Sequence, residues 1–207
     1  MKRFTLLTLT LLALLATAAQ AQSAATLTGE ERKDAVKYLE ETRKNFLESV
    51  KGLSEAQWKF KSAPDRWSVA EVAEHIAVSE ETLFGLVANQ IMKSPAAPEK
   101  KESVKGKEKQ LPELLTNRSQ KFQAPEMLKP TSRFATLDDC VKAFNASRDK
   151  TEAYVKTTQD DLRSHFAPHP VLKDLDAYQW IILISGHSAR HTDQIKEVKA
   201  DPNFPKK

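Results

Sequence analysis

The sequence contains a single cysteine, and this scarcity limits how the fold can be held together. Only Cys140 is available for disulfide chemistry among 207 residues, and one thiol cannot form a bridge within the chain. Cys140 also belongs to no CxxC spacing, which excludes the usual cysteine-rich structural zinc sites. Packing, with or without a bound metal, must therefore hold the fold.

A strong excess of charge is also missing. Lys and Arg together number 32 against 28 Asp and Glu, which gives a formal net charge of +4. Lysines gather between Lys100 and Lys109, but Glu102 and Glu108 lie among them, so we expect a solvated loop there. The sequence therefore does not predict a nucleic acid partner.

An apolar stretch near the N-terminus resembles a secretion signal. Two cations at positions 2 and 3 precede an apolar run over 4–16, and Ala-Gln-Ala at 19–21 fits a signal-peptidase site. The run is too short to span a bilayer comfortably, and no cysteine follows the cut, which argues against a lipoprotein. We expect a cleaved signal peptide at 1–21 and a mature chain, 22–207, that is periplasmic or secreted and not attached to a membrane. Cleavage leaves 30 basic and 28 acidic residues, a net charge of +2.

Four segments of the mature chain have helical periodicity, and no strand-like alternation, tight hairpin signal or internal repeat competes with them. Two of them begin with the spacing of a capping box, Thr28 with Glu31 and Ser68 with Glu71. Thr136 is a suitable N-cap for the third segment. The segments are about 29–50, 68–91, 137–158 and 175–198.

The connection between the second and third segments is long and of different composition. From 93 to 136 it is rich in Pro, Lys, Glu, Ser and Gln, and it contains one short helical candidate at 111–122. Long connections within compact domains are often functional or mobile. Four amphipathic helices with one long crossover predict an all-α four-helix bundle that forms a single domain over 22–207.

Two histidines lie four positions apart in GHSARHTDQIKEV, residues 186–198. In a helix His187 and His191 differ by about 40° around the axis and about 6 Å along it, so their imidazoles can converge. They accompany an apolar stripe that includes Ile184 and Ile195. Gly186, in the helix interior, indicates the close approach of another element.

A third ligand would have to come from another helix, and His75 is the best candidate. It lies in WSVAEVAEHIAVSE, about one turn after Val72 and on the inward side of the second helix. Three neutral imidazoles with an open position are typical of a catalytic metal site. The alternative is that these histidines are ordinary hydrogen-bonded residues at the core boundary, because an HxxxH spacing also arises by chance.

Other polar and aromatic residues have simpler interpretations. His165 and His169 lie in a Pro-rich loop and are predicted to face solvent. Arg148 could face the centre of the bundle, but an i,i+4 surface ion pair with Glu152 is the simpler account. Packing within the bundle or at its ends is the expected role of the three tryptophans, Trp58, Trp67 and Trp180.

Two motifs together resemble the DinB superfamily, four-helix bundles that include the YfiT-like metal-dependent hydrolases. They are RWSVAEVAEHIAVSEE at 66–81 and GHSARHTDQIKEVK at 186–199. The crossover RSQKFQAPEMLKPTSRF and the third-helix stretch FNASRDK extend the resemblance from about residue 30 to 205. In that family one second-helix histidine and both histidines of the HxxxH motif bind a divalent metal. The resemblance therefore implies that His75, His187 and His191 bind a metal.

The resemblance implies a metal-dependent hydrolase that acts on an unknown small substrate through water activated by a divalent metal. Zinc and nickel are the metals we expect first. A non-catalytic metal- or ligand-binding module is an alternative. A thiol-dependent transferase is another, which an oxidising compartment disfavours. Glu71, Glu74 and Glu80 have equal claims as proton acceptor, so no catalytic residue is predicted and the question of enzyme activity stays open. A homodimer also stays open, because no exposed apolar stripe marks a dimer face.

Overall fold

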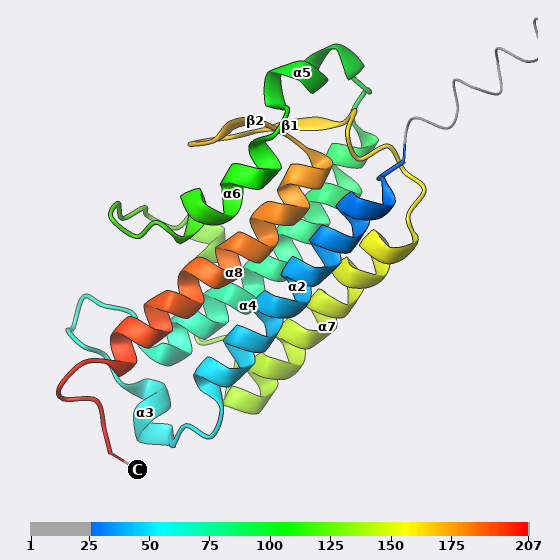
Figure 1. Ribbon diagram of the computed structural model, residues 1–207. Coiled ribbons are helices and arrows are strands. Elements are labelled where there is room, and N and C mark those ends of the chain that lie inside the picture. Colours follow the sequence, from blue (N-terminus) through cyan, green and yellow to red (C-terminus); the bar gives the residue numbers. More distant parts are fainter. Residues whose placement is uncertain (1–25, 207) are drawn as a thin grey trace, which may run out of the picture.

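The computed structural model describes residues 26–206, and four long helices dominate it (Figure 1). The predicted signal peptide lies outside the described residues. Helix α8 packs against α2 and α4, and α7 packs against the same two helices, so α2 and α4 lie diagonally opposite each other. This arrangement is the predicted four-helix bundle with a crossover between the second and third long helices. The four are α2 (Gly29–Val50), α4 (Val69–Asn89), α7 (Leu137–Thr157) and α8 (Ala177–Lys199).

Side-chain caps fix the start of each long helix. Both predicted capping boxes form: the hydroxyls of Thr28 and Ser68 accept from backbone N–H groups three residues later, and the Glu at that position accepts in return. Thr136 caps α7 in the same way without the reciprocal bond. Helix α8 begins two residues later than predicted, because Asp176 and Gln179 form a further capping box.

The crossover contains several short helices rather than one loop. They are η1 (Ile91–Lys93), η2 (Pro98–Lys100), α5 (Lys101–Val104), α6 (Lys107–Thr116) and η3 (Glu126–Leu128), while α3 (Glu55–Lys59) lies between α2 and α4. The helix predicted at 111–122 is displaced: α6 begins after Gly106, whose φ is 79°, and ends at Thr116. The guanidinium of Arg190 lies at the end of α6 and donates hydrogen bonds to the carbonyls of Leu115, Asn117 and Gln120.

Helix α6 packs directly on α8 at Gly186. A Cβ atom at this glycine would lie 2.5 Å from Cδ1 of Leu115 and 3.3 Å from the hydroxyl of Tyr38. The close approach predicted from Gly186 is therefore confirmed, and the approaching element is part of the crossover. It covers α8 immediately before His187.

A short β-hairpin corrects the all-α prediction. Strand β1 (Phe166–His169) pairs antiparallel with β2 (Lys173–Asp176), with Phe166 opposite Asp176. Each strand has only four residues, β1 contains Pro168, and Lys173 has a φ of 64°. These features remove the alternation and the Asn-Gly or Asp-Gly turn by which a hairpin is normally read from sequence.

The apolar core consists of two clusters. One includes Leu39, Val155 and Ile184, and the other includes Phe46, Phe144, Ile76 and Ile195. Trp180 belongs to the first cluster and Trp58 to the second, which confirms their packing roles. In the described part of the chain, no helix has the length and apolar character that a membrane crossing requires.

A polar network lies between the two clusters, and Arg148 is its centre. Arg148 is fully buried, so the predicted surface ion pair with Glu152 is wrong. Its guanidinium makes a bidentate contact with Glu80 of α4, with Nε 2.9 Å from Oε2. It also donates to Thr42 and the Leu39 carbonyl of α2, and to Ser188 of α8. One side chain of α7 thereby contacts the three other long helices.

Replacing Arg148 by methionine should lower the free energy of unfolding by about 3–5 kcal/mol, because the Glu80 carboxylate would stay buried without its cation. Urea denaturation of the purified protein measures this loss. Lys156→Met is a matched control on the same helix, since the Lys156 side chain is 48% exposed, and Glu152, the buried one of its two partners, keeps its ion pair with Arg43. Its loss should cost less than about 1 kcal/mol. Equal stability of the two variants would contradict the central role of Arg148.

Candidate metal centre

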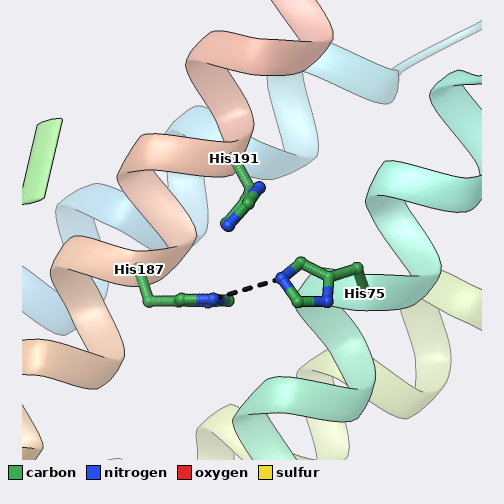
Figure 2. A group of neighbouring side chains, drawn as sticks. All are labelled: His75, His187 and His191. Atoms are coloured by element: carbon green, nitrogen blue, oxygen red, sulfur yellow. Dashed lines mark hydrogen bonds between the residues drawn. The ribbon is translucent and has the colours of Figure 1, made fainter. Parts of the chain in front are cut away.

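Three histidines from two helices meet beside the polar network (Figure 2). His75 comes from α4, and His187 and His191 come from successive turns of α8. One nitrogen of each ring can be chosen so that all three lie within 4.8 Å of one another. The structure thus brings together the three residues singled out from the sequence, while their binding of a metal stays a prediction.

Hydrogen bonds at the outer side of two rings direct their Nε2 atoms inwards. Nδ1 of His75 lies 2.8 Å from the carbonyl oxygen of Leu128, which can only accept, so we assign the proton to Nδ1. Nδ1 of His191 lies 2.8 Å from Oε1 of Gln194, which leads to the same assignment. In both neutral rings the lone pair is then on Nε2, as a metal ligand requires.

The spacing of the rings suits a metal ion. Nε2 of His75 lies 3.2 Å from Nε2 of His187. Two nitrogens at about 2.0–2.1 Å from a tetrahedral zinc lie about 3.3 Å apart, so this pair already has the separation of two ligands. Among the residues that the structure describes, the group consists of three imidazoles, which is the donor set of an open, catalytic type of site.

Burial keeps these histidines neutral. Loss of solvation lowers the pKa of His75, and it lowers the pKa of His191 to about 3, with the nearby His75 adding to the effect. The pKa of His187 is lowered well below its usual value, first by burial and then by its proximity to His191 and His75, because protons on neighbouring rings would repel each other. Neutral imidazole is the form that binds a metal.

The acidic residues considered as proton acceptors all have structural contacts. Glu71 completes the cap of α4 with Ser68. Glu74 accepts hydrogen bonds from the end of the crossover, and Glu80 holds Arg148. None of the three is therefore assigned as a catalytic base.

The remaining histidines contribute to folding rather than to the cluster. His165 and His169 are partly buried, which corrects the prediction that they face solvent. Nδ1 of His165 lies 2.8 Å from the Ser94 carbonyl, and Nδ1 of His169 accepts from the N–H groups of Val171 and Leu172. Both contacts involve the backbone of loops at one end of the bundle.

Three neighbours of the cluster were not predicted from the sequence. Trp67 packs on His75 with a ring-centroid distance of 5.1 Å, in addition to its expected apolar contacts. The Gln194 side chain could have been found, because it lies three positions after His191 on one helix face. The Leu128 carbonyl carries no sequence signal, since any residue offers the same backbone oxygen.

The chain belongs to the DinB superfamily, whose sequence model matches residues 38–195. That match includes the three clustered histidines and the whole crossover. The chain is similar to YuaE, an uncharacterized protein of Bacillus subtilis (strain 168), with 26% identity over 159 residues that cover 77% of this chain and 93% of YuaE.

Two solved structures share the fold. YfiT from Bacillus subtilis, described as a probable metal-dependent hydrolase with an unusual four-helix bundle topology, matches with a TM-score of 0.55 and 16% identity over 87% of this chain and 92% of YfiT. The four-helix bundle protein TT2238 matches with a TM-score of 0.51 and 17% identity over 80% of this chain and 98% of TT2238. At these identities the likeness shows the fold.

The metal-free protein should lose stability as the pH falls below about 6.5. An unfolded histidine takes up a proton near that pH, whereas His191, with a folded pKa of about 3, does not, so acid favours the unfolded state. This residue alone should cost about 1.6 kcal/mol between pH 6.5 and 5. The free energy of unfolding, measured by urea denaturation across this range, should fall less steeply with decreasing pH in His191→Gln than in the wild type. An equal pH dependence in the two proteins would contradict the low pKa of folded His191.

Proposed function

We propose that this protein is a divalent-metal-dependent hydrolase of a small substrate, with His75, His187 and His191 as the metal ligands. The observation that carries the proposal is the convergence of the three rings, with the Nε2 atoms of His75 and His187 3.2 Å apart. YfiT, which shares the fold, is described as a probable metal-dependent hydrolase, and this supports the proposal.

The residues around the centre have distinct tasks in this proposal. The Leu128 carbonyl and Gln194 orient the rings of His75 and His191, and this outer contact strengthens a ring as a ligand. Trp67 covers one side of His75 and limits the access of water. His75, His187 and His191 would hold a divalent ion, which would supply a Lewis acid for a substrate carbonyl and would lower the pKa of a bound water towards 7. Zinc and nickel both suit this donor set.

The purified protein should contain about one equivalent of a divalent metal. Mass spectrometry of protein prepared without a metal-affinity tag measures the content. His75→Ala and His187→Ala should each lose the metal, because two imidazoles hold an ion far more weakly than three. His165→Ala, a histidine outside the cluster, should retain it. Equal metal content in all four proteins would place the ion elsewhere.

Turnover separates an enzyme from a binding module. The metal-loaded protein, tested on a panel of small esters, amides and phosphoesters, should hydrolyse at least one class, and removal of the metal by a chelator should abolish the reaction. His187→Ala should be inactive, and His165→Ala should keep the wild-type rate. If zinc at about 100 times its dissociation constant adds about 2.7 kcal/mol of stability without any turnover, the protein is a metal-binding module instead.

A further inference from the structure

The residue before His75 makes an unusual set of contacts with the crossover. Glu74 is 6% exposed, and its carboxylate accepts hydrogen bonds from the backbone N–H groups of Thr131 at 2.6 Å and Arg133 at 3.2 Å. The Thr131 hydroxyl lies 3.3 Å from the same carboxylate. A buried acidic side chain of α4 therefore holds the last part of the connection that leads to α7.

The backbone between these two donors is shaped to receive a carboxylate. Ser132 has a φ of 63°, a conformation that residues other than glycine seldom adopt. A left-handed residue in such a segment turns successive N–H groups towards one side, which creates a concave site for an anion. Here the anion is the carboxylate of Glu74, so the conformation of Ser132 and the two backbone bonds depend on each other.

The same segment also carries the oxygen that orients His75. The Leu128 carbonyl, which lies 2.8 Å from Nδ1 of His75, is only three residues before Thr131. Leu128 is itself buried, with 8% exposure. Two consecutive residues of α4, Glu74 and His75, are thus bonded to two points of one short segment.

We propose that Glu74 is a positioning residue of the metal centre: its carboxylate holds residues 128–133 so that the Leu128 carbonyl keeps the Nδ1 proton on His75. The Nε2 lone pair of His75 is then directed at His187 and His191. The part of this inference that concerns metal affinity rests on the proposed function. The part that concerns the proton on His75 does not, and it can be measured without metal.

The first comparison is Glu74→Gln against Glu81→Gln. The amide in E74Q would present an NH₂ group to one of the two backbone donors and lose that bond. The segment would then be held less firmly, and the Leu128 carbonyl should be able to move away from Nδ1 of His75. Glu81 is on the same helix, its side chain is 58% exposed, and its ion pair among the described residues is with the Arg133 side chain, at 3.0 Å. In metal-free protein, ¹⁵N shifts of the His75 ring should show the Nδ1–H form in the wild type and in E81Q, and a mixture of tautomers in E74Q.

Zinc affinity, measured by competition with a chelating dye, is the second readout. Loss of an outer contact to a ligand typically weakens metal binding 10- to 100-fold, and we expect a loss in this range for E74Q and no change for E81Q. An E74Q protein that keeps both the single tautomer and the wild-type affinity would overturn the proposal. A wild type that takes up no zinc, with the tautomer altered only in E74Q, would support the positioning role and refute the proposed metal function.

A second pair of variants tests the same segment without changing Glu74. Glycine adopts a positive φ without strain, so Ser132→Gly should leave the His75 tautomer and the zinc affinity unchanged. Proline cannot adopt a positive φ, so Ser132→Pro should give a mixture of His75 tautomers and weaker zinc binding, as E74Q does. If E74Q folds poorly, Ser132→Pro still tests the segment. If Ser132→Pro behaves as the wild type does, the segment does not position His75 and the proposal is wrong.

Discussion

The buried ion pair between Arg148 and Glu80 is the contact on which the rest of the bundle depends. A guanidinium without access to water must have its donors satisfied by protein, and here the acceptors come from all three of the other long helices. The three helices can offer acceptors to all of these donors only in one register along the bundle axis. Ser188, which bonds to both Arg148 and Glu80, is the residue next to His187, and Glu80 lies less than two turns after His75 on α4. The separation of the histidines is therefore set by the same register that satisfies the buried charge.

Much of this fold follows from local rules that operate within one helix. Caps such as Thr28 and Ser68 bond to residues three positions away, and the apolar spacing decides which face of each helix is buried, so both can be read without knowledge of the partner helix. The same reasoning places His187 and His191 on one face of α8, because four positions in a helix amount to little more than one turn. His75 required a further step, the expectation that inward-facing residues of different helices meet in the core.

The features that sequence reasoning missed depend on contacts between distant parts of the chain. Arg148 has a suitable partner four positions away in Glu152, and nothing local reveals that it instead pairs with a residue 68 positions earlier. The end of α6 is capped by Arg190, which lies on α8. The helical pattern of the sequence continues past this end, because nothing near residue 116 in the sequence marks the cap. The two strands are too short for alternation to appear, and β2 begins with Lys173 in a conformation usually left to glycine.

The polar network also divides the hydrophobic interior into two separate clusters along the length of the bundle. Apolar clusters without a continuous core between them can open with different free energies, so the two ends of this molecule are candidates for distinct cooperative units in hydrogen exchange. The three histidines lie close to the boundary between these units, on two helices that run through both. An ion bound there would link the two units. It would raise the free energy of opening at either end and make the two ends unfold more cooperatively.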